Sequence, residues 1–165
     1  MIFEYFEFLC YNNIYLLINA GVNLMSTPLV QALSTRICHT VNLDTGLMAA
    51  IEKLVDNKIG ALPVVGSSGF LEGIISERDI IREIHFHGEI ENLTVKKVMT
   101  KNVITCSLDS RATEIMELMT VNKIRHVPIM NKAALLGMVS IGDVVSRLLN
   151  KYKFEAELLK DYINS

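Results

Sequence analysis

Two short motifs pair a hydroxyl group with a carboxylate three residues further on: Ser76-x-x-Asp79 and Ser140-x-x-Asp143. Each is predicted to lie where a strand turns into a helix. The free N–H groups of a helix N-terminus and a serine hydroxyl can hold a phosphate, and an aspartate can accept both hydroxyls of a ribose. The same residues can instead form a capping box, in which the helix satisfies its own first turn. One copy alone would favour the cap, whereas two copies shift the balance toward ligand binding.

The two motifs belong to an internal repeat with an offset of 65 residues. Residues 30–63 align with residues 95–128 without a gap, and after one deletion residues 73–79 align with residues 137–143. A repeat of this length is one supersecondary unit, which usually cannot bury its apolar face alone. The two copies are therefore predicted to pack as a pseudo-two-fold pair, with ligand-sized clefts between them.

Each copy is predicted to fold as a β-α-β-β-α unit, so the chain is expected to be an α/β (α+β) protein. Asp44 and Asp109 are predicted to cap the first helix of each copy. The predicted strands cover residues 37–43, 61–65 and 71–75 in the first copy and 103–108, 126–130 and 135–139 in the second. The closing helices are predicted over residues 77–84 and 142–149.

The predicted boundaries divide the chain into five parts. They are an N-terminal extension (1–29), the first repeat (30–85), a connector (86–94), the second repeat (95–149) and a C-terminal helix (150–165). Extra helical segments are thus expected at both ends. In the C-terminal helix, one face is expected to carry Phe154, Leu158, Leu159 and Tyr162. His85 and His87 suggest a metal site, but their spacing on a polar connector gives poor ligand geometry, so they are interpreted as a solvated linker.

The composition bears on partners and compartment. Of 165 residues, 16 are basic and 18 acidic, and the net charge of −2 indicates no basic face for nucleic acid. Cys10, Cys38 and Cys106 show no metal-binding spacing, which predicts reduced thiols in a cytoplasmic protein.

Residues 1–24 contain no lysine or arginine, and their longest unbroken apolar run, residues 14–18, is far shorter than the ~20 residues of a membrane span. They are interpreted either as a helix that packs on the core or a partner, or as sequence before a natural start at Met25. In both cases they are expected to be dispensable for ligand binding.

The tandem motifs Ile-x-x-h-Pro-h-h and Gly-h-h-Ser-x-x-Asp, where h is apolar, resemble a pair of cystathionine β-synthase (CBS) domains, or Bateman module, over about residues 30 to 149. Residues 76–82, 124–128 and 155–163 resemble stand-alone bacterial CBS-pair proteins. The resemblance implies a sensor that binds an adenine nucleotide between the repeats and signals to a downstream protein, which the sequence does not name. The candidate ligands are AMP, ADP, ATP, NAD(H) and S-adenosylmethionine. The resemblance also implies that Asp79 and Asp143 are ribose ligands.

Several other side chains are candidate ligand contacts. Arg125 and His126 replace Gly60 and Ala61 of the first copy. This difference indicates that the two residues contact an anion. The alternative is that Arg125 faces the solvent and His126 belongs to the core. In the resembled family, basic residues at the matching positions of the AMP-activated kinase gamma subunit hold phosphates. The pair is therefore expected to work with Ser140 and Asp143, while the other cleft relies on Arg78 or Arg82. The resemblance places Ile37, His39, Ile59 and Ala61 in one adenine pocket and Asn102, Ile104 and Ile124 in the other, although each of them could equally belong to the core.

Catalysis finds no support in the sequence, which lacks a nucleophile–base arrangement, a Walker-type loop and a GxGxxG motif. A non-enzymatic sensor is therefore predicted. The alternative is a ligand-free scaffold that acts by dimerisation or by binding a redox partner such as thioredoxin. A homodimer is expected in either case, through apolar residues of the closing helices: Ile80, Ile81, Val144, Val145 and Leu148.

Overall fold

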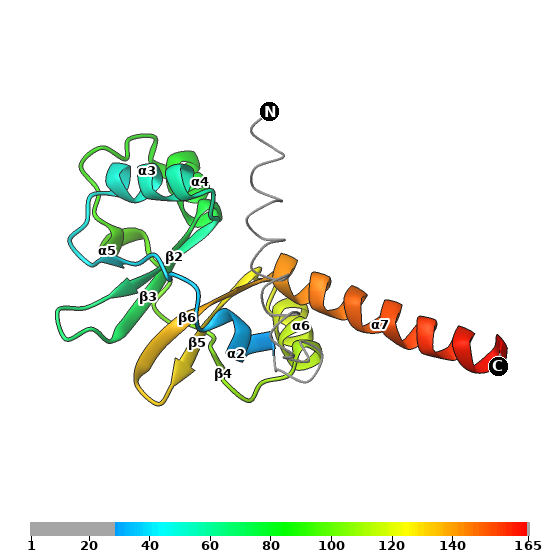
Figure 1. Ribbon diagram of the computed structural model, residues 1–165. Helices are drawn as coiled ribbons and strands as arrows, with labels where there is room; N and C mark the ends of the chain where they lie inside the picture. Colours follow the sequence, from blue (N-terminus) through cyan, green and yellow to red (C-terminus); the bar gives the residue numbers. More distant parts are fainter. Residues whose placement is uncertain (1–28, 165) are drawn as a thin grey trace.

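The computed structural model describes residues 29–164 and contains two units with the same order of elements (Figure 1). The first unit consists of β1 (Val41–Asn42), α3 (Leu47–Asn57), β2 (Ala61–Val65), β3 (Leu71–Ser76) and α4 (Glu77–His87). The second consists of β4 (Cys106–Ser107), α6 (Ala112–Val121), β5 (His126–Asn131), β6 (Ala134–Ser140) and α7 (Ile141–Asn164). The predicted α/β fold of two β-α-β-β-α repeats is confirmed.

Each unit contains one three-stranded sheet, and the two sheets have the same topology. The strand orders are β1-β2-β3 and β4-β5-β6, with the first pair parallel and the second antiparallel. In this register Ala61 lies opposite Ser76, and His126 lies opposite Ser140. Each motif serine therefore lies beside the first residue of the neighbouring strand, where the adenine and phosphate contacts were predicted.

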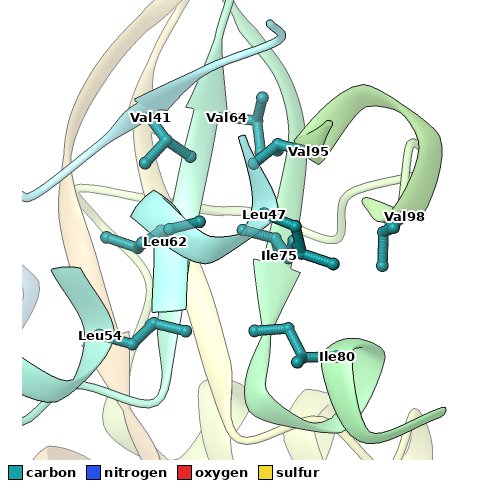
Figure 2. Close-up of a cluster of buried hydrophobic side chains, with 10 residues drawn as sticks. Val41, Leu47, Leu54, Leu62, Val64, Ile75, Ile80, Val95 and Val98 are labelled. Carbon is teal, nitrogen blue, oxygen red and sulfur yellow. The ribbon is translucent and has the colours of Figure 1, made fainter. Parts of the chain in front are cut away.

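The core of the first unit forms between the sheet and its helices, as Figure 2 shows. In α3 the residues Leu47, Ala50 and Leu54 are buried, and their spacing of three and four places them on one helical face. That face packs against Leu62, Val64 and Ile75 of the sheet. The same periodicity in α6 buries Ile115 and Met119 in the core of the second unit.

The short helices α2 (Leu29–Leu33) and α5 (Val95–Val98) are exchanged between the units. Val30 and Leu33 of α2 are buried in the core of the second unit, and Val95 and Val98 of α5 are buried in the core of the first. Each repeat therefore completes the core of the other. Removing either repeat would expose the apolar face that the exchanged helix covers.

Several predicted details are wrong. Asp44 and Asp109 cap no helix, because α3 and α6 begin after Gly46 and Arg111. The closing helix predicted over residues 77–84 is longer, because His85 to His87 form the last turn of α4, where His87 contacts Glu83. The strands predicted over residues 37–43 and 103–108 shorten to β1 and β4.

The C-terminal helix predicted from residue 150 is present as the continuation of α7, which runs without a break to Asn164. Within residues 29–164, no helix is long and apolar enough to cross a membrane. The predictions for residues 1–24 and for a start at Met25 lie outside the described residues.

Candidate functional site

Asp79 lies in the first turn of α4 and is buried, with 7% of its surface exposed. Its Oδ2 accepts hydrogen bonds from the Ser76 backbone N–H (3.0 Å) and the Ser76 hydroxyl (2.6 Å). Its Oδ1 accepts a hydrogen bond from Arg82 Nη2 at 2.7 Å. The carboxylate thus caps α4 with one oxygen and holds an arginine with the other, so the capping box that the motif allowed is confirmed here.

Asp143 repeats this arrangement in the first turn of α7. Its Oδ2 accepts hydrogen bonds from the Ser140 backbone N–H (2.9 Å) and hydroxyl (2.5 Å). Its Oδ1 accepts a hydrogen bond from Arg36 Nη1 at 2.7 Å, and Arg36 precedes Asp143 by 107 residues. The second aspartate is therefore held by an arginine that belongs to the first repeat.

A cavity of about 260 Å³, here called the Asp79 cavity, opens between the two repeats. The β3–α4 junction supplies Ser76, Arg78 and Asp79, together with Glu77 and Arg82. The second repeat supplies Asn102, Ile104, Ile124, Arg125 and His126. The cavity therefore combines apolar side chains, one buried carboxylate and three arginines, and neither repeat could form it alone.

A second cavity of about 410 Å³, here called the Asp143 cavity, lies on the equivalent side of the other unit. Ser140 and Asp143 line it together with residues of the first repeat: Ile37, His39, Ile59, Gly60, Ala61 and Arg36. Ile37 stands at the rim, because 83% of its surface is exposed. All the predicted contact residues thus line one cavity or the other.

The predicted grouping of Arg125 with Ser140 and Asp143 is wrong. Arg125 lines the Asp79 cavity and not the Asp143 cavity, whereas His126 lines both. The reason is that the start of β5 faces the β3–α4 junction of the first repeat. Arg78 Nη1 at that junction donates a hydrogen bond to the Lys123 carbonyl oxygen at 2.8 Å. The arginine-rich cavity is therefore the one that contains Asp79.

His126 occupies space that the first repeat leaves free at Gly60. A Cβ atom at residue 60 would lie only 2.9 Å from His126 Cε1. The glycine at this position thus has a packing role, because a side chain there would displace the imidazole. Since Gly60, Ala61 and His126 line both cavities, this contact forms the wall between them.

Burial lowers the pKa of His126 from its ordinary value of 6.5; the carboxylates of Glu77 and Asp143 act in the opposite direction, and Arg125 lowers it further. Between the folded and the ordinary pKa, the unfolded chain therefore binds more protons than the folded chain. We expect the free energy of unfolding to fall as the pH drops below about 6.5. His126→Gln should remove this pH dependence of the free energy of unfolding, as urea titrations from pH 8 to 5 would show. An unchanged slope in the variant would contradict it.

The lowered pKa also changes the pH window expected for ligand binding. Phosphate would bind best to the imidazolium form, so affinity should still strengthen as the pH falls. Because the imidazole of the ligand-free protein takes up its proton below pH 6.5, the strengthening should continue to a lower pH than it would for a histidine of ordinary pKa.

Cys38 and Cys106 are free thiols, whereas Cys10 lies outside the described residues. Burial raises the pKa of the Cys38 thiol, and it raises the pKa of Cys106 to about 11. Thiolate is the form that attacks a disulfide, so both groups are weak nucleophiles at neutral pH.

The sequence analysis missed Arg36 and Thr100 as partners of the two aspartates. The Thr100 hydroxyl donates to Asp79 Oδ1 at 3.4 Å, and Arg36 holds Asp143. The sequence held a signal for these two partners, because Thr35–Arg36 aligns with Thr100–Lys101 in the repeat, and each pair includes one of them. No group of three or more His, Cys, Asp or Glu side chains within the described residues could hold a metal ion.

Comparisons with known proteins agree with the repeat. A family model described as CBS domain matches residues 21–86 and 95–150. The chain is 37% identical over 125 residues to the CBS domain-containing protein CBSX3, mitochondrial, of Arabidopsis thaliana, which covers 73% of this chain and 61% of that protein. It therefore spans about three fifths of the length of that relative.

Two solved structures have the same fold. The CBS-domain containing protein ATU1752 from Agrobacterium tumefaciens is 37% identical, with a TM-score of 0.66 over 68% of this chain and 84% of that chain. The CBS domain pair of protein MJ0100, solved in complex with 5′-methylthioadenosine and S-adenosyl-L-methionine, is 28% identical, with a TM-score of 0.67 over 76% of this chain and 98% of that chain. This chain belongs to the CBS domain family and carries two CBS repeats in tandem.

Proposed function

We propose that this protein is a non-catalytic regulatory module that binds an adenine-containing ligand in the Asp79 cavity and passes its occupancy to a partner protein. The candidate ligands are AMP, ADP, ATP, NAD(H) and S-adenosylmethionine. The observation that carries the proposal is the cavity itself, where a buried carboxylate, apolar side chains and three arginines from two repeats converge. The complex of the MJ0100 domain pair with two adenosine derivatives supports the class of ligand.

The chemistry of the cavity suits a nucleoside with a charged substituent. Ile104 and Ile124 provide apolar contact for a base, and Asp79 can accept ribose hydroxyls once a ligand replaces its bond to Arg82. At about 260 Å³ the cavity is slightly smaller than the ~300–1,000 Å³ of typical ligand sites. The nucleoside would therefore fill it, and the phosphates would extend to the mouth.

The arginines stand where those phosphates would emerge. The Arg82 side chain is 56% exposed, and Arg78 and Arg125 are also exposed. The Arg125 side chain makes no hydrogen bond or ion pair to the part of the chain that the structure describes, so its guanidinium is available for a phosphate without losing a partner. The proposal thus assigns anion binding to the Asp79 cavity.

Ligand binding in this cavity requires both repeats, which gives a route for signalling. A ligand that contacts Asp79 of one repeat and Arg125 of the other stabilises one relative placement of the two units. Burial raises the thiol pKa values of Cys38 and Cys106, which does not favour these two thiols as groups that react with a thioredoxin-type partner.

The homodimer and the cytoplasmic location remain part of the proposal. Ile80 and Val144 are buried in the unit cores and cannot contribute to an interface, whereas Ile81 and Val145 are 67% and 39% exposed. A dimer through the closing helices would therefore use Ile81 and Val145. The Arabidopsis relative is named as mitochondrial, so the compartment must be measured directly.

Mass spectrometry of small molecules released from the denatured, freshly purified chain tests the proposal without choosing a ligand in advance. We expect an adenine-containing compound in a stoichiometry that falls when Asp79→Asn is purified in the same way. Recovery of a ligand without adenine, at a stoichiometry unaffected by the substitution, would contradict the proposed site.

A further inference from the structure

The C-terminal part of α7 projects away from both units (Figure 1). It also carries a continuous stripe of exposed apolar residues. Successive residues of the stripe are four, three, four, three and four positions apart, and all are exposed: Val145, Leu149, Tyr152, Ala156, Leu159 and Ile163. We call these six residues the tail stripe. The alternation of four and three is the heptad pattern of a two-stranded coiled coil, in which the seam repeats every ~3.5 residues.

Among residues 29–164, the tail stripe takes no part in either hydrophobic core. Val144 is fully buried and Leu148 packs against the core of the second unit, so they attach the start of α7 to the body. Leu159 and Ile163 remain 63% and 79% exposed. Exposed apolar residues that follow one line along a projecting helix are typical of an interface.

The charges beside the stripe indicate what covers it. Glu155 directly precedes the stripe residue Ala156, and Lys153 and Lys160 directly follow Tyr152 and Leu159. In a parallel pair of identical helices, the residue before one seam position faces the residue five positions later on the partner. Glu155 would then face Lys160 of the second copy, twice in each dimer. In an antiparallel pair, lysines would flank lysines and glutamates would flank glutamates.

We infer that the tail stripe binds the tail stripe of a second copy of this chain, and that the two helices form a parallel two-stranded coiled coil over residues 145–163. The two-fold axis then brings each stripe residue against the same residue of the second copy. The inference is independent of nucleotide binding, because no residue of the tail stripe lines either cavity. The coiled coil adds a second contact to the proposed dimer of the closing helices, and Val145 belongs to both contacts.

Sedimentation equilibrium of the full chain tests the partner. The wild type should be a dimer at tens of micromolar, and the double variant Leu159→Glu, Ile163→Glu should raise the dimer dissociation constant at least tenfold. The matched control is Leu158→Glu, because Leu158 is 54% exposed on the same helix but lies off the stripe. A monomeric wild type, a trimer or tetramer, or an equal effect of the control would overturn the inference.

Disulfide trapping tests the orientation. Ala156→Cys should cross-link to itself under mild oxidation, because a parallel pair brings the two residues face to face. Leu158→Cys should not exceed the background of the wild type. An antiparallel pairing centred on the stripe would place residue 156 opposite residue 152, so an absence of cross-linking in Ala156→Cys would overturn the parallel arrangement.

Charge reversal tests the register of the helices. Glu155→Lys and Lys160→Glu should each weaken the homodimer, by up to about fivefold for each lost pair. An equimolar mixture of the two variants should form a heterodimer as tight as the wild type, because both cross-pairs then join opposite charges. A mixture no tighter than the single variants would show that Glu155 and Lys160 do not face each other. Titration of these variants with AMP should match the wild type, which separates a failure of this interface from a failure of the nucleotide site.

Discussion

Asparagine at position 79 is expected to weaken adenine-nucleotide binding in the Asp79 cavity by about 1–3 kcal/mol, or roughly five- to 150-fold. The reason is that an amide cannot accept two ribose hydroxyls as a carboxylate does. The substitution should also lower the free energy of unfolding by about 1–3 kcal/mol, because Ser76 and Arg82 lose a charged acceptor inside the protein. Isothermal titration calorimetry and urea unfolding measure the two effects separately.

Two matched variants show which role of the carboxylate is being measured. Ser76→Ala removes the 2.6 Å hydrogen bond from the serine hydroxyl but keeps the carboxylate, so it should reduce stability more than affinity. Asp143→Asn makes the same change in the other cavity and should leave binding in the Asp79 cavity intact. If Asp79→Asn loses stability while its affinity for every candidate ligand stays unchanged, Asp79 is a helix cap only.

Alanine at position 125 is expected to weaken ATP binding by tenfold or more, while adenosine binding changes little. A hydrogen bond to a charged group contributes about 1.5–3 kcal/mol, and only the phosphates of ATP reach the exposed guanidinium at the cavity mouth. The free energy of unfolding should change by less than about 0.5 kcal/mol, because the Arg125 side chain is exposed and makes no hydrogen bond to the described residues.

Lys96→Ala is the control for the loss of one positive charge, because Lys96 is exposed on α5 and lines neither cavity. It should leave both affinities unchanged. Equal losses for ATP and adenosine would show that Arg125 acts on the fold of the cavity and not on phosphates. If Arg125→Ala no longer weakens ATP binding in a chain that also carries Asp143→Asn, the phosphates lie instead in the Asp143 cavity.

Much of the fold follows from local sequence. Apolar spacing predicted α3 and α6, and alternating turn and apolar segments predicted the paired strands, because these elements depend on residues close together in the chain. The predicted helix caps at Asp44 and Asp109 are wrong because Gly46 and Arg111 occupy the cap positions, two residues further on in each case. Boundaries at this scale depend on how the preceding turn packs.

The residues that line the two cavities were predicted better than their grouping. An internal repeat shows that Gly60 corresponds to Arg125 and Asp79 to Asp143, but it does not show which copies meet in space. That follows from the exchange of α2 and α5, which places each leading helix in the core of the other unit. The contact between Arg36 and Asp143 has the same origin, since it joins residues 107 positions apart.

The central claim is that the Asp79 cavity binds an adenine-containing ligand. Calorimetric titration of the full chain with AMP, ATP, NADH, S-adenosylmethionine and 5′-methylthioadenosine, repeated with Asp79→Asn, tests it most directly. We predict that at least one of the five binds the wild type with a dissociation constant below about 1 mM, or about −4 kcal/mol, and that Asp79→Asn weakens this binding at least fivefold. A folded wild-type chain that binds none of the five at that concentration, or one that binds equally well with asparagine at position 79, would contradict the claim.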